Sequence, residues 1–296
     1  MTEIPNHKRL LVSFSGGETS AYMLWCLLND KEVTSCWHEI VIVFANTGEE
    51  HPSTLKFVDY VDRNIANCRV VWVESVVRHN QRKSCGHRIV DYSTAIRGPD
   101  LFIDMALKYG VPNKSYPHCT RSLKLDPITS YVRDELKWPS GGYSTAIGIR
   151  KDEADRISSK ASENGIIYPL VNMFPATKKD VNAFWKKQPC RLEITGYQGN
   201  CVWCWKKTLR KHYTLITEDP SRYDTPKMLE RDYALHGHNV YGTPRKIFRE
   251  NKTVKDLITG AQEPFEPFHD ENRVYDDPLL DVGGGCGESC EVWSDE

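Results

Sequence analysis

The sequence predicts an α/β protein with a doubly wound, Rossmann-like parallel sheet of about five strands and helices on both faces. Four runs rich in β-branched and aromatic residues occur in the first half of the chain, and the first three are almost wholly apolar. Parallel strands that are covered on both faces have this composition. Segments with helical spacing separate these runs, and such strand–helix–strand alternation favours a parallel sheet.

The expected elements follow in order along the chain. Pro52 suits the first turn of a helix in which apolar residues recur at helical spacing. Sheets of this class bind ligands beyond the carboxyl ends of their strands. The expected strands are Arg9–Ser15, Ile40–Asn46, Arg69–Ser75 and Tyr143–Ile149. The expected helices are Thr19–Leu28, Pro52–Asn64, Leu101–Tyr109, Asp126–Leu136, Lys178–Lys187 and Val202–Leu215.

We expect one domain over residues 1–217 and a C-terminal extension over residues 218–296. After about Glu218 the chain is polar, rich in Asp, Arg and Pro, and weakly periodic. This composition indicates helical and irregular pieces appended to the first domain, without a second core. The last stretch contains three consecutive glycines and two cysteines, and we expect a flexible tail because consecutive glycines resist ordering.

Composition and charge narrow the class of protein. With 296 residues, 40% of them hydrophobic, the chain can form a sizeable core. The formal net charge of −1 gives no overall basic field, so nucleic acid is not the favoured partner. There is no apolar leader and no run near the roughly 18 apolar residues that a membrane span needs. We expect a cytoplasmic protein without membrane association, with a homo-oligomeric state left open.

The first expected strand ends in a turn that suits an anion. Ser15-Gly16-Gly17-Glu18-Thr19-Ser20 joins this strand to the following helix. Glycines at a helix start let backbone N–H groups converge on an anion, and the helix dipole adds to the attraction. The alternative is a plain turn capped by Thr19 or Ser20. The second strand also ends in polar residues and glycine, FANTGEE, so two neighbouring strand ends would form a crevice for a nucleotide.

Four motifs in the same order resemble the 3′-phosphoadenylyl sulfate (PAPS) reductase family of the PP-loop adenine nucleotide α-hydrolase superfamily. SFSGGETS resembles the PP-loop, and FANTGEEHPSTLKFV resembles the family's second-strand motif; GIRKDEADR and YQGNCVWC are similar to two later motifs. The resemblance spans roughly residues 8–215 and implies that PAPS, adenylyl sulfate or ATP binds there. The implied nucleotide-binding residues are Ser13, Ser15, Gly16, Gly17, Thr19, Ser20, Asn46, Thr47, Gly48, Lys124, Arg150 and Arg156.

The two arginines have a second interpretation. Arg150 follows an expected strand and Arg156 lies six residues later. One guanidinium group can donate hydrogen bonds to two phosphate or sulfate oxygens at once, which suits an anionic substrate. The alternative is ion pairing at the surface with neighbouring carboxylates, of which the segment has three: Asp152, Glu153 and Asp155.

Clustered cysteines point to a metal centre. The chain has ten cysteines, many for a reducing compartment, where clustered thiols bind metal or react more often than they form disulfides. The resemblance implies a [4Fe–4S] cluster, with zinc as the alternative, because both use four thiolates. The family has Cys-Cys where this chain has Cys119-Thr120, so one ligand is missing. The expected ligands are Cys119, Cys201 and Cys204, with Cys190 as the fourth and Cys85 as its substitute.

The resemblance implies a sulfonucleotide reductase. In that family a cysteine of a C-terminal segment attacks the sulfate sulfur, and thiol exchange, with a thioredoxin-like reductant, then releases sulfite. Here Cys286 would attack and Cys290 would resolve the intermediate.

Two other functions stay open. Thr19 stands where the family more often has Asp, and Asp152-Glu153 replaces Gln-Ser. Both changes favour ATP-dependent, pyrophosphate-releasing adenylation or sulfur transfer, of the DNA phosphorothioation or tRNA thiolation type, with Mg²⁺. The aromatic and basic stretch WCWKKTLRKHY suggests instead a non-enzymatic iron–sulfur nucleotide sensor or a nucleic-acid-binding partner.

Overall fold

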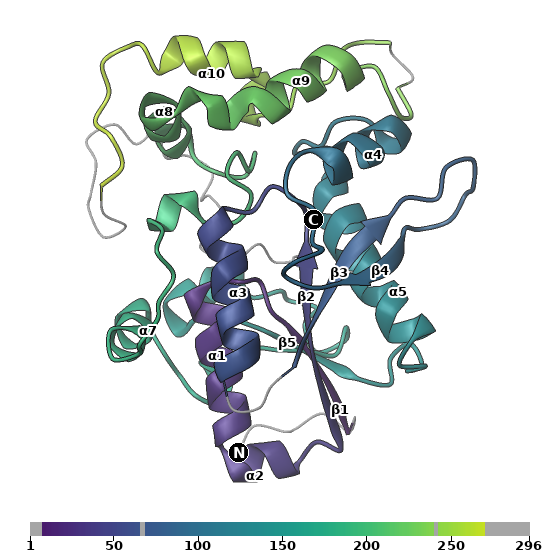
Figure 1. Cartoon of the computed structure of the whole chain (residues 1–296), viewed down its shortest axis with the longest axis vertical. Coiled ribbons are helices and arrows are strands. Elements are labelled where there is room, and N and C mark those ends of the chain that lie inside the picture. Colours follow the sequence, from purple (N-terminus) through teal and green to yellow (C-terminus); the bar gives the residue numbers. More distant parts are fainter. Residues whose placement is uncertain (1–7, 66–68, 240–241, 270–296) are drawn as a thin grey trace.

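The protein is an α/β structure on a six-stranded, mostly parallel sheet (Figure 1), given by a computed structural model that describes residues 8–65, 69–239 and 242–269. The sheet order is β4-β3-β2-β1-β5-β6, and only the β3–β4 pair is antiparallel. The strands are β1 (Arg9–Ser13), β2 (Glu39–Asn46), β3 (Val70–Val76), β4 (Gly86–Val90), β5 (Ser144–Ile147) and β6 (Ile166–Ile167).

Helices cover both faces of this sheet. On one face α1 (Glu18–Asn29), α3 (Pro52–Asn64) and α7 (Lys178–Trp185) pack against Leu10 and Val12 of β1. On the other face α5 (Asp126–Asp134) packs against neighbouring strand residues, among them Leu11, Val43 and Val73. Successive residues of a strand point to opposite faces, so an apolar run such as Leu10–Val12 is buried from both sides. The predicted α/β class with helices on both faces is confirmed.

The sheet has more strands than the sequence predicts. The four expected strands correspond to β1, β2, β3 and β5, whereas β4 and β6 were not predicted. β4 has the sequence GHRIV with a single buried residue, and β6 has only two residues, so neither carries the long apolar run that predicts a strand. Both lie at the edges of the sheet, where one face or side can stay in water.

The expected helices are present with small shifts at their ends, except the last. Val202–Thr208 forms turns, and α8 begins only at Leu209, where the Thr208 side chain accepts a hydrogen bond from Lys211 N as the helix cap. The remaining helices are α2 (Lys31–Ser35), α4 (Asp100–Tyr109), α6 (Pro169–Asn172), α8 (Leu209–Glu218), α9 (Asp224–Tyr233) and α10 (Val254–Gly260), with a π-helical turn at Cys119–Leu125.

The chain after Glu218 contributes to a second core, so the expectation of an appended tail was wrong for its described part. In Figure 1 α8, α9 and α10 lie together beyond the carboxyl edge of the sheet. Leu229, Phe248 and Leu257 are buried there together with Phe102 of α4. Single apolar residues between polar stretches have no local periodicity, and their partner lies more than a hundred residues earlier. No helix within the described ranges is long and apolar enough to cross a bilayer.

Candidate functional site

The turn after β1 has a conformation that requires glycine. Gly16 has φ of +82°, and a Cβ atom there would lie 3.0 Å from side-chain carbons of Thr54 and Val58 on α3. α1 then begins at Glu18 with Gly17 as its N-cap, and no side chain caps the helix. The alternative of a turn capped by Thr19 or Ser20 is therefore wrong. The N–H groups of the first helical turn have no side-chain acceptor there, as an anion-binding turn requires.

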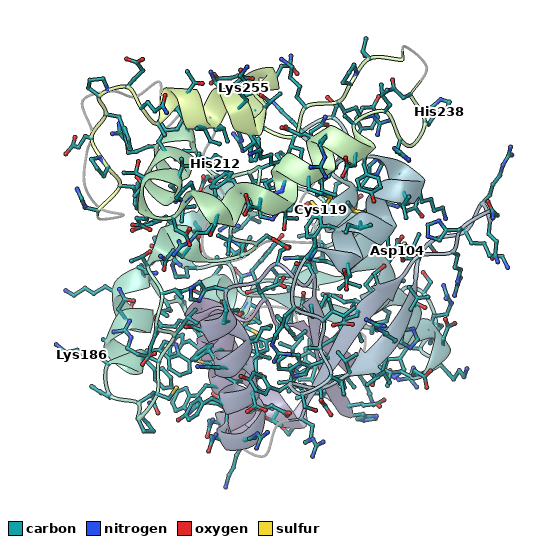
Figure 2. The ribbon with its side chains drawn as sticks, turned by 45° about the horizontal axis from the view of Figure 1, so that its top comes forward. Asp104, Cys119, Lys186, His212, His238 and Lys255 are labelled. Atoms are coloured by element: carbon teal, nitrogen blue, oxygen red, sulfur yellow. The ribbon has the colours of Figure 1, made fainter. Side chains whose placement is uncertain are left out.

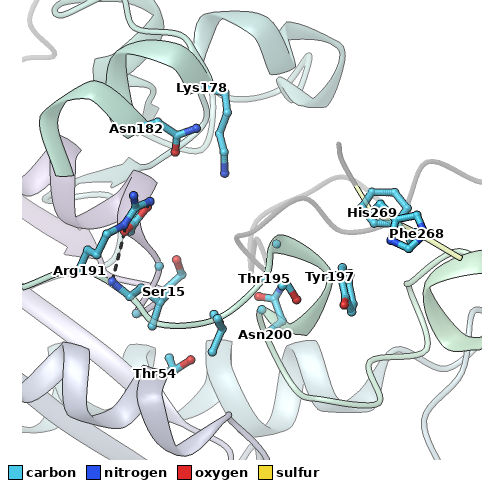
Figure 3. A pocket seen from close by; sticks show the side chains of 17 residues that line it. Ser15, Thr54, Lys178, Asn182, Arg191, Thr195, Tyr197, Asn200, Phe268 and His269 are labelled. Carbon is cyan, nitrogen blue, oxygen red and sulfur yellow. Dashed lines mark hydrogen bonds and ion pairs between the residues drawn. The ribbon is translucent and has the colours of Figure 1, made fainter. Parts of the chain in front are cut away.

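A cavity of about 270 Å³ opens over this turn (Figure 3). One wall is the turn itself, and the facing wall comes from α7 and from the segment that follows it. In Figure 3 the side chains of Lys178 and Asn182 point from α7 toward the space above the turn. The lining residues are Ser15, Gly16, Gly17, Glu18, Thr54, Lys178, Asn182, Arg191, Leu192, Ile194, Thr195, Gly196, Tyr197, Gly199, Asn200, Phe268 and His269.

Glu18 links the two walls of the cavity. Its carboxylate accepts hydrogen bonds from Arg191 Nε at 3.1 Å and Arg191 Nη2 at 3.2 Å. It also accepts one from the backbone N–H of Leu192 at 3.2 Å. The backbone carbonyl of Glu18 accepts a hydrogen bond from the indole of Trp185, the last residue of α7. The segment after α7 is thus held against the first turn of α1.

The loop after β2 is closed, in contrast to the loop after β1. Asn46 and Thr47 are fully buried. The Asn46 amide donates to Glu74 Oε1 at 2.6 Å and to the Ile96 carbonyl at 2.9 Å. The Thr47 hydroxyl donates to Glu50 Oε1 at 2.7 Å. These predicted nucleotide-binding side chains are therefore committed to bonds within the protein, and none of them lines the cavity.

The arginines of the GIRKDEADR motif are paired with carboxylates. Arg150 is buried, and its Nε donates to Asp152 Oδ1 at 3.1 Å while its Nη1 lies 3.4 Å from Glu153 Oε2. Arg156 Nη1 donates to Glu153 Oε1 at 2.6 Å. Both arginines are therefore paired with carboxylates, as the alternative expected, but Arg150 is buried and not at the surface; anion binding by either arginine stays a prediction. Arg150 also donates from Nη1 to the Thr19 hydroxyl at 3.0 Å, so it does contact the first turn of α1.

The other predicted nucleotide-binding residues divide into two groups. Ser15, Gly16 and Gly17 line the cavity. Thr19 and Ser20 are buried in the first turn of α1, Ser13 ends β1, and Lys124 is buried in the π-helical turn. Gly148 brings the end of β5 close to α1, because a Cβ atom there would lie 3.0 Å from Ser20 Cα.

Three of the predicted metal ligands belong to the second core. Cys201 and Cys204 are buried in it, and Cys119, labelled in Figure 2, packs against it at the start of the π-helical turn. The Thr47 hydroxyl lies 3.2 Å from Cys201 Sγ. Burial raises the pKa of the Cys201 thiol well above its ordinary value, and the nearby Lys124 ammonium opposes that shift.

The fourth predicted ligand lies in different surroundings. Cys190 is next to Arg191 in the chain. Burial raises the pKa of its thiol, and the negative charges of Glu193 and Glu18 raise it further. The substitute, Cys85, is buried with its thiol 3.8 Å from the Tyr109 hydroxyl. The described residues contain no group of three or more His, Cys, Asp or Glu side chains placed to share one metal ion. As placed, the thiols do not form the four-ligand set that the motif predicts.

Sequence reasoning missed the facing wall of the cavity. Lys178, Asn182, Arg191 and Tyr197 lie more than 150 residues after the turn that they face. Two lysines open the helix Lys178–Trp185 and could have indicated an anion site there. The same pair is equally typical of a solvent-exposed helix end. Cys286 and Cys290, the predicted catalytic residues, lie outside the described residues.

Comparison with known proteins gives two relatives. No family model matches the chain. It is 32% identical over 291 residues to the uncharacterized nin region protein ORF290 of Escherichia phage lambda, covering 96% of this chain and 94% of that protein. It is also 26% identical over 213 residues to an uncharacterized protein of Methanocaldococcus jannaschii, covering 71% of this chain and 34% of that protein.

Proposed function

The chain belongs to the family of the nin region protein ORF290 of phage lambda, and we propose that it is a PP-loop enzyme of the PAPS reductase type. An adenine nucleotide binds with its phosphates against the turn at Ser15–Gly17. The cavity over that turn carries this proposal. It combines backbone N–H groups at a helix start, the cations Lys178 and Arg191 and the aromatic ring of Tyr197, which suit a ligand that is anionic at one end and flat at the other.

The proposed reaction is thiol-dependent reduction of adenylyl sulfate or PAPS. The Cys286 thiolate attacks the sulfate sulfur, the S–O bond to the phosphate breaks, and the nucleotide leaves with the electron pair. The Cys290 thiolate then attacks the Cys286 sulfur, which releases sulfite and forms a disulfide that a thioredoxin-like dithiol reduces. Phe268 and His269 line the cavity. Cys286 follows 17 residues later, and a chain of that length spans up to about 60 Å.

The test is turnover of three nucleotides. The full-length protein is incubated with PAPS, adenylyl sulfate and ATP, with thioredoxin and its reductase present, and sulfite and pyrophosphate are measured. Sulfite release supports the reductase, and Cys286→Ser is expected to abolish it. Cys36→Ser is the matched control, because Cys36 is an exposed thiol. Equal turnover by Cys286→Ser and the wild type would contradict the proposed mechanism.

ATP-dependent chemistry is the second candidate. Glu18 lies in the first turn of α1. Asp152 and Glu153 pair with Arg150, which donates a hydrogen bond to Thr19 of the same turn. Carboxylate and phosphate oxygens together favour Mg²⁺. Release of pyrophosphate from ATP in the presence of Mg²⁺, without sulfite release from the other nucleotides, would favour adenylation or sulfur transfer over reduction.

The iron–sulfur cluster stays a prediction from the cysteine pattern, and no step of the proposed reaction depends on it. Protein purified without oxygen is expected to be brown and to absorb near ~400 nm if a cluster is present. Iron and zinc analysis of Cys85→Ser and Cys190→Ser variants then identifies the fourth ligand. Because the proposed reaction consumes thiols, we propose the cytoplasm, where thiols are kept reduced, as its compartment.

A further inference from the structure

Arg191 presents a free edge to the cavity. Its Nε and one N–H of Nη2 donate to Glu18, and a guanidinium group has five N–H donors in a fixed fork. The other three donors have no hydrogen-bond partner among the residues that the structure describes. The side chain is 48% exposed, whereas that of Glu18 is only 9% exposed. The pair therefore has a buried carboxylate side and an open cationic side.

The position of this pair relates it to the glycine turn. Glu18 is the first residue of α1 and follows Gly17 directly. Its carboxylate does not cap its own helix; it accepts hydrogen bonds from Arg191 and from the N–H of Leu192. Figure 3 shows Arg191 beside Ser15, with Lys178 reaching toward the same space from α7. Cations from two segments thus face the N–H groups of the turn across the cavity.

We propose that Arg191 is a binding residue for the anionic group of the nucleotide, and that Glu18 is the positioning residue that holds it beside the glycine turn. The inference rests on the proposed function and adds the ligand's second point of contact. The phosphate or sulfate oxygens accept hydrogen bonds from the turn on one side and from the free edge of Arg191 on the other. Lys178 adds a second positive charge.

Glu18 gives this inference a test of sign. A carboxylate that did nothing except lie near the anion would repel it, so its neutralisation would tighten binding. A carboxylate that positions Arg191 has the opposite effect, because its loss lets the guanidinium move away from the turn. The substitution Glu18→Gln therefore distinguishes a positioning role from simple proximity.

The experiment is calorimetric titration of the full-length protein with ADP, and with adenosine as the ligand without an anionic group. Arg191→Gln is expected to weaken ADP binding roughly 10- to 100-fold, the range of a charge-assisted hydrogen bond, and to leave adenosine binding unchanged. The salt dependence of ADP binding is also expected to fall, since one cation is lost. Glu18→Gln is expected to weaken ADP binding roughly threefold to tenfold, because a neutral hydrogen bond replaces a bidentate ion pair.

Arg63→Gln is the matched control, because Arg63 forms an exposed ion pair with Asp59 on α3 and neither residue lines the cavity. The affinity of the Arg63→Gln variant for ADP is expected to stay within about twofold of that of the wild type. If Arg191→Gln does not fold, Arg191→Lys keeps the charge without the fork, and ADP binding is then expected to weaken roughly threefold to tenfold.

Three outcomes would overturn the inference. Tighter ADP binding by Glu18→Gln would show that the carboxylate only repels the ligand. Wild-type affinity in Arg191→Gln, or in Arg191→Lys where that variant is used, would remove Arg191 from the site while leaving the proposed function intact. A wild-type protein that binds no adenine nucleotide would overturn the proposed function and this inference together.

Discussion

Two strand-end loops of the same sheet have similar sequences and opposite environments. Ser15–Ser20 after β1 and Asn46–Glu50 after β2 both combine glycine with polar side chains, and the two strands are neighbours. The first loop opens on the cavity, whereas Asn46 and Thr47 are fully buried. Polar residues and glycine at a strand end thus indicate a turn of special geometry, and the packing above the turn decides whether a ligand reaches it.

The CxxC segment covers the second loop. Cys201 pairs with Glu50 in an antiparallel bridge, and the N–H of Val202 donates to the Glu49 carbonyl at 3.1 Å. The indole of Trp203 donates to the Glu49 carboxylate at 2.6 Å. A segment 154 positions after Thr47 therefore turns a polar loop into part of the protein interior. The equivalent cover over the first loop, the segment around Arg191, leaves a cavity.

Removing the buried carboxylate under the second loop is expected to have the largest effect on stability. Glu74 is fully buried and accepts hydrogen bonds from Asn46 Nδ2, Ile96 N and Arg88 Nε. Glu74→Ala leaves the Ile96 N–H and one N–H of the Asn46 amide without this acceptor, and it is expected to lower the free energy of unfolding by about 3–5 kcal/mol, measured by urea denaturation.

Asp59→Ala is the matched control, because it removes a carboxylate from an ion pair with the exposed Arg63 on α3. A loss below about 1 kcal/mol is expected there. Equal losses in the control and in Glu74→Ala would mean that the second loop is not sealed as described.

Gly48→Ala is expected to have the next largest effect. Gly48 has φ of +86°, and a Cβ atom there would lie 2.4 Å from the backbone carbonyl oxygen of Gly98. Backbone strain and the clash together are expected to cost about 3 kcal/mol in the free energy of unfolding. Gly141 has φ of +70° and no atom within 4 Å of its Cβ position, so Gly141→Ala is expected to cost only about 1 kcal/mol. Similar costs for both would exclude the close approach to Gly98.

Much of the sheet could be predicted because its signals are local. The apolar runs of β1, β2 and β3 identify strands, and the spacing of Pro52–Asn64 identifies a helix whose bounds agree with α3. The glycine turn could also be predicted, because a glycine pair directly after an apolar run indicates a turn with a positive φ. Gly16 has such a φ.

The environment of each loop could not be predicted, because burial depends on distant segments. Nothing local to Asn46-Thr47-Gly48 indicates that Cys201–Trp203 covers it. Nothing near Ser15 indicates that Arg191 faces it. One sequence pattern assigned a nucleotide-binding role to both loops. Of the two, the first lines the cavity and the second does not.

The pH dependence of stability tests the burial of Glu49. Burial raises the pKa of its carboxyl group, so the folded state holds this proton to a higher pH than the unfolded chain does. The stability that it contributes is present below the ordinary carboxyl pKa, about 4.3, and is lost as pH rises through the raised folded value.

Glu49→Gln cannot ionise, and its amide can still bond to Trp203 and Thr225, the present partners of the carboxylate. The stability of this variant relative to the wild type is therefore expected to rise as pH is raised from about 4 toward 7. Urea denaturation across that range measures it. Glu163→Gln, at an exposed position, controls for the loss of one charge, and the same rise in both variants would contradict the prediction.

The smallest stability effect, and the sharpest contrast between the loops, is expected from Ser15→Ala and Thr47→Val. Ser15 lines the cavity and shares one hydrogen bond with Ser20, so its loss costs below about 1 kcal/mol but weakens ADP binding. Thr47 bonds to Glu50 and lies against Cys201 inside the protein. Thr47→Val is therefore expected to cost about 1–2 kcal/mol and to leave the Kd for ADP unchanged. Reversal of this pattern in calorimetry and urea denaturation would move the ligand site from the first loop to the second.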